Sequence, residues 1–486
     1  MSAALFLIAL SAVLALGLGV YAGRGREMGL EQWSVGSRGF GAVLVFLLLA
    51  GEIYTTFTFL GASGFSYGLG APAYYILAYG TLAYVISYFI LPPVWSYAKK
   101  HSLVSQPDFF AAKFDSPALG VLVALVDIVA LIPYLVLQFT GLGIIVQIAG
   151  YGAISKDVAI IIGALVVTAY VIVSGIRGSA LTAIVKDGLI IVVVVFMGIY
   201  LPVHYYGGIG AMFATLDHAK PGFLAFPASG QSVSWFVSTV LLTCLGFFMW
   251  PHSFAACFSA KNRSVFRKNA ILLPIYQLVL LFVFFVGFAA VLQVPGLKGA
   301  ATNMALLKIS VAAFPPWMVG IIGATGVLTA LVPGSLIMMS ASTLFARNLV
   351  GFVRPHASNA QTVMVAKFTV PVVALVAVYF TIQGSSTIVA LLLMGYNFVT
   401  QLFPALVASL MKRNPVSKQG AFAGIFVGVG TVVFLTLTHQ TIGTLIPGLP
   451  EMIRDLNVGI IALGLNLIVM VAVSAMTPKT AMLPAE

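Results

Sequence analysis

The sequence predicts an all-α integral membrane protein with thirteen transmembrane helices. Of its 486 residues, 61% are hydrophobic and 7% are charged, whereas soluble domains carry about 25% charged residues. Apolar stretches of about 20 residues, the length that crosses a bilayer, recur along the whole chain. Two of these stretches are interrupted by glycine, proline and polar residues near their middle. We therefore expect one polytopic domain over residues 1–486, with a binding site inside the membrane.

The length criterion places the spans in order along the chain. They cover about residues 3–22, 40–66, 73–97, 118–148, 157–175, 180–201, 232–257, 270–292, 317–346, 365–383, 386–410, 419–438 and 457–476. The first is not expected to be a cleaved signal peptide, because no Lys or Arg precedes it and Arg24 and Arg26 follow it. The N-terminus should therefore lie outside, and an odd number of spans puts the C-terminus in the cytoplasm.

The net charge of +12 follows from this topology. With the N-terminus outside, nineteen of the 24 Lys and Arg residues fall on the cytoplasmic side, as the positive-inside rule requires. The five that remain outside are Lys156, Lys220, Lys298, Lys308 and Arg454. The excess of Lys and Arg over Asp and Glu therefore does not indicate a nucleic-acid partner. No obligate protein partner is evident.

The first interrupted span lies in residues 40–70. It begins as an apolar helix and becomes polar and glycine-rich in GEIYTTFTFLGASGFSYGLG, near the middle of a bilayer. Backbone that leaves a helix inside hydrocarbon is tolerated only where it lines a cavity or holds a ligand. We therefore predict a binding site in this stretch, which contains Glu52, Thr55, Thr56, Thr58, Gly61, Ser63 and Gly64.

The second interrupted span is residues 232–257. Gly246 directly precedes the motif FFMWPH, which contains Trp250, Pro251 and His252. Proline removes a backbone donor and clashes with the preceding turn. An ordinary proline kink is the alternative interpretation. Two interrupted spans in corresponding positions of two halves nevertheless indicate a midplane site between inverted repeats. We predict five-helix repeats at 40–201 and 232–410, an extra N-terminal helix at 3–22 and two C-terminal helices within 419–476.

Four stretches together resemble the sodium:solute symporter family, which has the leucine-transporter-type fold. They are GEIYTTFTFLGASGFSYGLG, FFMWPH, IPYLVLQFTGLG at 132–143 and GYNFVTQLFPAL at 395–406. Within the family, the chain is most similar to the bacterial monocarboxylate permease branch. The resemblance implies a secondary active symporter in a bacterial inner membrane that takes up a short monocarboxylate such as lactate, pyruvate or acetate. It implies no cofactor apart from a coupling ion.

Two alternatives stay open beside this interpretation. One is a sodium-coupled symporter of a small amino acid or another carboxylate, and another is a transporter-like channel or sensor. An enzyme is not expected, because the few polar residues form no His/Asp/Glu metal cluster, no general acid and base pair and no nucleotide-binding loop.

The expected substrate cavity is small and polar, with aromatic walls. Both broken helices can offer free backbone N–H groups to a carboxylate, the first after Gly61 to Gly64 and the second after Pro251. His252 is expected either to donate to the anion or only to pack and bond a carbonyl. The remaining substrate-binding candidates are Thr55, Thr58, Phe59, Ser63, Tyr134, Gln138, Trp250, Asn397 and Gln401.

The resemblance also implies where a coupling ion would lie. In sodium-using relatives the ion sits between the first broken helix and the ninth span, and its carbonyl ligands carry over to Gly51, Tyr54 and Thr329, with Asp187 nearby. The two Ser/Thr hydroxyl ligands carry over to Val332 and Pro333, which have no hydroxyl. Pro333 leaves the carbonyl of Thr329 without its helical donor.

Lys186 stands where sodium-coupled relatives usually have a small hydroxyl residue. Its ammonium group can occupy the vacated ion position, and burial favours the neutral form of an amine, so the group can gain and lose a proton in each cycle. We hypothesise proton coupling through Lys186, with Asp187 as its partner. The alternative for Lys186 is that its side chain only extends to the cytoplasmic surface. If the chain is sodium-coupled, the ion is expected at Gly51, Tyr54 and Thr329.

Overall fold

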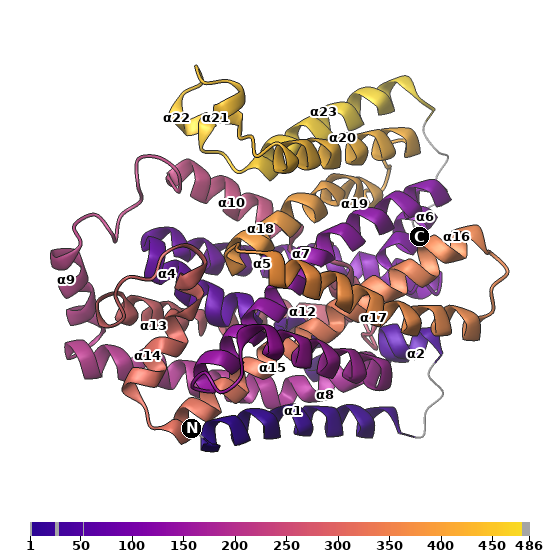
Figure 1. The fold of residues 1–486 in the computed structure, drawn as a ribbon. Coiled ribbons are helices and arrows are strands. Elements are labelled where there is room, and N and C mark those ends of the chain that lie inside the picture. The colour runs from indigo at the N-terminus through magenta and orange to yellow at the C-terminus, as the bar shows by residue number, and fades with distance from the viewer. Residues whose placement is uncertain (1, 25–28, 52, 479–486) are drawn as a thin grey trace.

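The computed structural model describes residues 2–24, 29–51 and 53–478, so the predicted site residue Glu52 lies outside the described residues. Within these ranges the chain forms helices and no β-strand, with one isolated bridge between Phe40 and Ala260. The prediction of an all-α protein is confirmed. Figure 1 shows the long helices side by side in one bundle, with α1 (Ser2–Gly23) along one side and α20 (Lys418–Leu437) and α23 (Val458–Met476) on the opposite side.

Ten helices of the described part are long and apolar enough to cross a membrane, and a bent pair raises the count to eleven. The protein is therefore a multi-pass membrane protein, while the count of thirteen spans stays a prediction. The difference arises at two places. The predicted span 40–66 contains only a short apolar helix, α3 (Ala42–Gly51), before its break, and the predicted spans 157–175 and 180–201 both lie within α8 (Lys156–Tyr206).

The first predicted repeat is built around the broken helix. After α3 the chain continues as a π-helix, η2 (Phe57–Ala62), and then as α4 (Ser63–Leu69). Single π-helical turns occur frequently at functional sites. The elements around this break are α2 (Leu30–Val35), η1 (Gly36–Arg38), η3 (Ala71–Tyr74), α5 (Tyr75–Lys100), α6 (Gln106–Phe114), α7 (Pro117–Ala149) and α8.

The second predicted repeat contains the bent pair. Helix α10 (Val233–Gly246), with the short η4 (Phe247–Met249), meets α11 (Pro251–Phe258) at an angle of 48°. The break falls at Trp250, as the proline after it predicts. The further elements are α12 (Ser264–Gln277), α13 (Leu280–Gln293), η5 (Gly299–Met304), α14 (Ala305–Ala313), α15 (Pro316–Leu344), the π-helix η6 (Phe345–Val350), α16 (Gly351–Val353), α17 (Asn359–Gln383), α18 (Ile388–Val399), η7 (Thr400–Leu402) and α19 (Phe403–Leu410).

Short helices connect these parts. Helix α9 (Ile209–Ala219) lies in the predicted outer loop between the two repeats, while α21 (Ile442–Leu445) and α22 (Glu451–Arg454) connect α20 to α23. Helices α20 and α23 pack closely, because Gly424 of α20 leaves room for Asn466 and Met470 of α23. A methyl group on Gly424 would lie 2.6 Å from the side-chain oxygen of Asn466.

Helix α8 changes direction at Gly175. Its 51 residues would form a straight helix of about 76 Å, more than twice the hydrocarbon thickness of about 30 Å. Gly175 has φ 56° and ψ −167°, a conformation that is essentially restricted to glycine. A Cβ atom at this position would also lie 2.9 Å from the Trp33 ring and 3.0 Å from the Trp33 carbonyl oxygen. The kink therefore depends on the absence of a side chain.

Replacing Gly175 with alanine is expected to destabilise the protein by about 1–3 kcal/mol, through backbone strain and overpacking against Trp33. The matched control is Gly188→Ala on the same helix, where nothing lies within 4 Å of the added methyl group. The control should be neutral or slightly stabilising, because alanine favours helix by about 1 kcal/mol over glycine. Thermal unfolding in detergent measures the melting temperatures of both variants. Equal melting temperatures would contradict the prediction that a side chain at position 175 is strained.

Candidate functional site

Threonine hydroxyls hold the first helix break together. The Thr58 hydroxyl donates to the carbonyl of Ile53 (2.6 Å) and accepts from the backbone N–H of Thr55 (3.1 Å). The Thr55 hydroxyl accepts from the N–H of Phe57 (3.0 Å). The predicted substrate-binding residues Thr55 and Thr58 thus satisfy backbone groups that the break leaves without helical partners. All these residues are buried.

Helix α7 is bonded to the same break. The Thr56 hydroxyl donates to Oε1 of Gln138 (2.8 Å), and the two helices approach closely because Gly141 has no side chain to meet Thr56. Gln138 is fully buried, and its Nε2 has no hydrogen-bond partner among the described residues. Gln138 therefore retains a free donor beside the break, as a substrate-binding residue requires.

The second break exposes an aromatic surface to α7. Trp250 has an extended backbone (φ −69°, ψ 134°), and Pro251 begins α11 after it. The Tyr134 ring packs against Trp250, with 4.8 Å between ring centroids, and against His252, with 5.4 Å. His252 is buried, and its Nδ1 has no hydrogen-bond partner within the described part of the chain. Tyr134, Trp250, Pro251 and His252 thus lie together at the second break, and their role in substrate binding stays a prediction.

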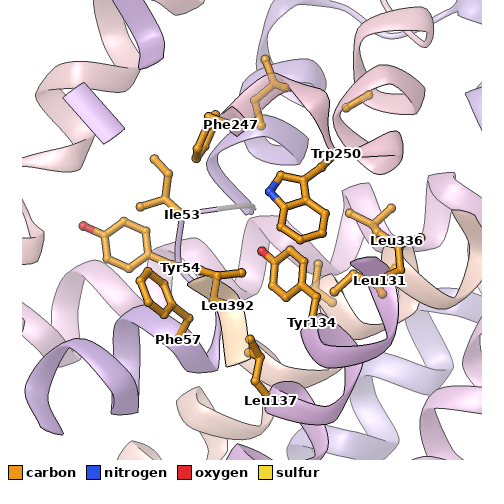
Figure 2. Packing of buried hydrophobic residues seen from close by; sticks show 14 of the residues in the cluster. Ile53, Tyr54, Phe57, Leu131, Tyr134, Leu137, Phe247, Trp250, Leu336 and Leu392 are labelled. Carbon is orange, nitrogen blue, oxygen red and sulfur yellow. The ribbon is translucent and has the colours of Figure 1, made fainter. Parts of the chain in front are cut away.

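The two breaks lie next to each other in the centre of the bundle. Figure 2 shows Ile53 of the first break near Phe247 of the second and Trp250 beside Tyr134, while the Tyr54 ring points away from Trp250. The Trp250 ring also packs against Gly395 of α18, where a Cβ atom would lie only 2.5 Å from the end of the indole. Gly395 begins the GYNFVTQLFPAL stretch, and its missing side chain admits the indole.

Other residues of the glycine-rich stretch pack helices together. A Cβ atom on Gly61 would lie 2.9 Å from Ile388 of α18, and one on Gly64 would lie 2.7 Å from the Thr302 carbonyl oxygen of η5. The Ser63 hydroxyl donates to a carbonyl one turn earlier, and Phe59 is buried. The structure places Phe59, Gly61, Ser63 and Gly64 in the walls around the break, with the two glycines in close helix contacts.

The structure does not bring Asn397 and Gln401 to Tyr134 and Trp250. Nε2 of Gln401 donates to the carbonyl of Gly459 in α23 (3.2 Å), and Asn466 of α23 donates to the carbonyl of Gln401 (2.7 Å). The Asn397 side chain also lies against Gly459. Gln401 connects the second predicted repeat to the C-terminal helix, because its buried amide requires hydrogen-bond partners and α23 supplies them. Oδ1 of Asn397 has no hydrogen-bond partner among the described residues.

A buried ion pair lies beside the first break. Nζ of Lys186 is 2.9 Å from Oδ1 of Asp187 and donates to the carbonyl of Tyr54 (3.2 Å). The two charged side chains are 0% and 5% exposed, so Lys186 turns toward the break and not toward the surface. A Cβ atom on Gly51 would lie 3.5 Å from Nζ. The ammonium group therefore lies beside Gly51 and the Tyr54 carbonyl, two of the positions predicted for a cation.

Sequence reasoning missed Tyr276 of α12, which supports this cluster. The Tyr54 hydroxyl donates to the Tyr276 carbonyl (3.2 Å), and the two rings meet edge to face at 4.8 Å. Tyr276 is one of many aromatic residues in apolar spans, so no signal in the sequence singled it out.

Among the described residues, no hydrogen bond or ion pair joins Thr329 or Asp127 to the Lys186 cluster. The Thr329 hydroxyl donates to the Gly326 carbonyl within α15 (2.6 Å). Asp127 of α7 is fully buried, and neither carboxylate oxygen has a hydrogen-bond partner among the described residues. The same residues contain no group of three or more His, Cys, Asp or Glu side chains that could hold a metal ion.

Two apolar grooves lie away from the breaks. One, of about 520 Å³, lies between α7, α17, α18 and α20, and the other, of about 450 Å³, lies between α7, α15 and α17. Neither is lined by a residue of the predicted substrate or ion site. Exposed apolar side chains such as Val129, Phe380 and Leu437 line the first groove, as expected of a surface that faces lipid.

Comparisons with known proteins agree with this architecture. The sequence model of the sodium:solute symporter family matches residues 33–428. An uncharacterized symporter of Bacillus subtilis, YhjB, is 63% identical over 479 residues, which cover 99% of this chain and 98% of the relative. A monocarboxylate transport permease protein of Rhizobium johnstonii is 30% identical, over 93% of this chain and 91% of the permease. The outward-open structure of a Na⁺-coupled sialic acid symporter superposes with a TM-score of 0.79 at 18% identity, over 99% of both chains.

Proposed function

The chain belongs to the sodium:solute symporter family, and we propose that it is a secondary active symporter that takes up a short monocarboxylate together with a proton. The family and the structural neighbour consist of transporters and not of enzymes, so a small solute and a membrane setting follow directly. Our proposal goes beyond the family in three respects, which are the substrate class, the coupling ion and the topology. We place the protein in a bacterial inner membrane, with its N-terminus outside and its C-terminus in the cytoplasm.

The substrate proposal rests on the two adjacent breaks and on the Rhizobium permease, whose name states monocarboxylate transport. The free Nε2 of Gln138 and the N-terminus of α11 after Pro251 provide donors for a carboxylate. Tyr134 and Trp250 provide apolar area for a short carbon chain. Lactate, pyruvate and acetate each combine one carboxylate with such a chain.

The hydrogen bond from Lys186 to the Tyr54 carbonyl is the single observation that supports proton coupling best. This bond joins the lysine nitrogen to the carbonyl of Tyr54, one of the carbonyls that the resemblance assigns to the family's sodium site. Val332 and Pro333 supply no hydroxyl ligands there, and a sodium ion requires several oxygen ligands. One ammonium group needs only a few acceptors, and the Tyr54 carbonyl and the Asp187 carboxylate are present.

The proposed coupling works through the attachment of α8 to the first broken helix. When Lys186 is protonated, its charge strengthens the bond to Tyr54 and balances Asp187. When Lys186 releases its proton toward the cytoplasm, the bond to Tyr54 weakens and the two helices can separate. The proton thereby favours one conformation over the other, which is the condition for coupling its gradient to solute movement.

Uptake into liposomes tests the proposal. We expect labelled lactate, pyruvate or acetate, but not alanine, to accumulate under an inward proton gradient without sodium. A sodium gradient at equal pH should drive no accumulation. Uptake that requires sodium would overturn proton coupling, and accumulation of alanine alone would overturn the substrate class. Ionic currents far above the turnover of a carrier would indicate a channel instead.

A further inference from the structure

A small cavity with several polar lining residues lies next to the second helix break, on the side that the predicted topology assigns to the cytoplasm. Its walls include Pro251 and Ala255 of α11, Ser340 and Thr343 of α15, and Ser105 and Gln106 at the start of α6. The cavity measures about 10 Å³, which leaves room for about one water molecule. The broken helix of the candidate substrate site is thus also one wall of this cavity.

The cavity wall contains polar groups without partners. Gln106 is fully buried, and neither its amide nitrogen nor its amide oxygen has a hydrogen-bond partner among the described residues. The same is true of the hydroxyls of Ser340 and Thr343, which are 5% and 3% exposed. Buried polar groups are almost always hydrogen-bonded, so each exception requires an explanation. Water or a polar solute passing through the cavity would supply the missing partners.

Four side chains, which we call the α6 latch, join the first turn of α6 to the segment after α15: Ser105, Asp108, Arg347 and Asn348. Of these, Ser105 also lines the cavity. The Ser105 hydroxyl donates to Oδ1 of Asn348 (3.0 Å), and Nδ2 of Asn348 donates to Oδ1 of Asp108 (2.8 Å). Nε of Arg347 lies 3.5 Å from Oδ2 of Asp108. Asn348 thus bonds to both residues that shape the first turn of α6.

The latch joins two elements that are far apart in sequence. Ser105 caps α6 by accepting the N–H of Asp108 (3.2 Å), so the latch holds the N-terminal turn of α6 as a unit. Arg347 and Asn348 belong to the π-helix η6, which directly follows α15. A π-helical turn is less regular than an α-helical one and is frequent at functional sites. A shift of η6 would break the bonds from Asn348 and Arg347 to α6 together.

We propose that the cavity is the route by which the transported solute leaves toward the cytoplasm, and that the α6 latch is its gate. Separation of α6 from η6 widens the cavity and admits water. Gln106, Ser340 and Thr343 then hydrogen-bond a small hydrated solute that bears acceptor oxygens, such as a carboxylate, as it leaves the break at Pro251. This gate requires a transporter but depends on neither the substrate nor the coupling ion proposed above.

Thiol labelling in inside-out vesicles tests the gate without any transport measurement. In a background in which Cys244 and Cys257 are replaced by alanine, Thr343→Cys reports access to the cavity. We expect a charged, membrane-impermeant thiosulfonate to react slowly with it while the latch is intact. Asn348→Ala should accelerate the reaction roughly 5- to 30-fold, as expected when hydrogen bonds that favour the closed state are lost. Asn348→Asp should act in the same direction, because it places a second carboxylate against Asp108.

Three controls make the result decisive. Thr325→Cys lies on α15 outside the cavity and bonds to the Ile321 carbonyl, so Asn348→Ala should not change its labelling. Glu451→Ala breaks an exposed ion pair with Arg454 and should leave Thr343→Cys labelling unchanged. Asn262→Cys in an exposed loop sets the rate for an open position. An unchanged Thr343→Cys rate in both Asn348 variants, at an unchanged melting temperature, would overturn the proposal. So would a rate equal to that of Asn262→Cys with the latch intact.

Discussion

Replacing Lys186 with arginine is expected to abolish proton-driven uptake while the protein remains folded. Arginine keeps the positive charge and can donate to both Asp187 and the Tyr54 carbonyl, but its guanidinium does not release a proton. If the proton on Lys186 is exchanged in each cycle, the initial rate of labelled lactate uptake under an inward proton gradient should fall by at least about 100-fold. A normal rate in Lys186→Arg would contradict proton coupling through this residue.

Lys186→Met separates the structural role from the coupling role. It removes the charge and leaves the Asp187 carboxylate buried without its partner, which costs about 3–5 kcal/mol. We therefore expect loss of uptake together with a lower melting temperature, whereas Lys186→Arg should lose uptake alone. The matched control is Lys367→Met, because Lys367 is half-buried on α17 and forms no ion pair with any described residue. Uptake by this control should stay within about twofold of the original protein, as is usual for surface substitutions.

Replacing Gly395 with alanine is expected to have the second largest effect. The added methyl group would lie 2.5 Å from the Trp250 ring and 3.1 Å from the backbone oxygen of Ala130. The backbone cannot retreat easily, so the indole must move away from Tyr134. Overpacking of this kind costs about 1–3 kcal/mol, and a displacement of about 1 Å at a site can lower its activity about 100-fold. We expect the uptake rate to fall by at least about tenfold, with a raised half-saturating substrate concentration.

Gly464→Ala is the control for this substitution. Gly464 also lies in a membrane helix, α23, but nothing lies within 4 Å of a methyl group added there. It should leave the concentration dependence of uptake unchanged. If Gly395→Ala behaved like Gly464→Ala in uptake and in thermal unfolding, the position of the Trp250 ring would not be important for transport, contrary to the prediction.

The helix breaks were predictable because their cause is local. Glycine and proline limit what the backbone can do wherever they stand, so Pro251 after Trp250 indicated the bend between α10 and α11. The polar and glycine-rich residues after Gly51 likewise indicated a break in the predicted span 40–66, and α3 ends at Gly51. The π-helix that follows was not predicted. The conformations at both places follow from residues within one or two turns of the break.

The partners of polar side chains were not predictable in the same way. Helix α18 is apolar around most of its surface, so the pattern of residues did not indicate which neighbour the Asn397 side chain contacts. In the structure it contacts α23 instead of Trp250. The bond between Asp108 and Asn348 joins residues 240 positions apart, and both lie among ordinary polar residues of the connecting segments. Lys186 was identified through a family comparison, because spacing alone does not relate it to Tyr54.

Lys186 and Asp187 are neighbours on one helix, and this has an electrical consequence. Both charges of the pair move together when α8 moves. The loaded site, with protonated Lys186, Asp187 and a carboxylate, and the returning site, with neutral Lys186 and Asp187, each carry one net negative charge, so the two movements cancel. One proton that enters with one carboxylate is also neutral in sum. Membrane voltage changes the energy of a transferred charge by about 2.3 kcal/mol per 100 mV, and it would contribute nothing to such a cycle. A cell would then power this uptake from its pH difference alone and could continue it while its membrane is depolarised.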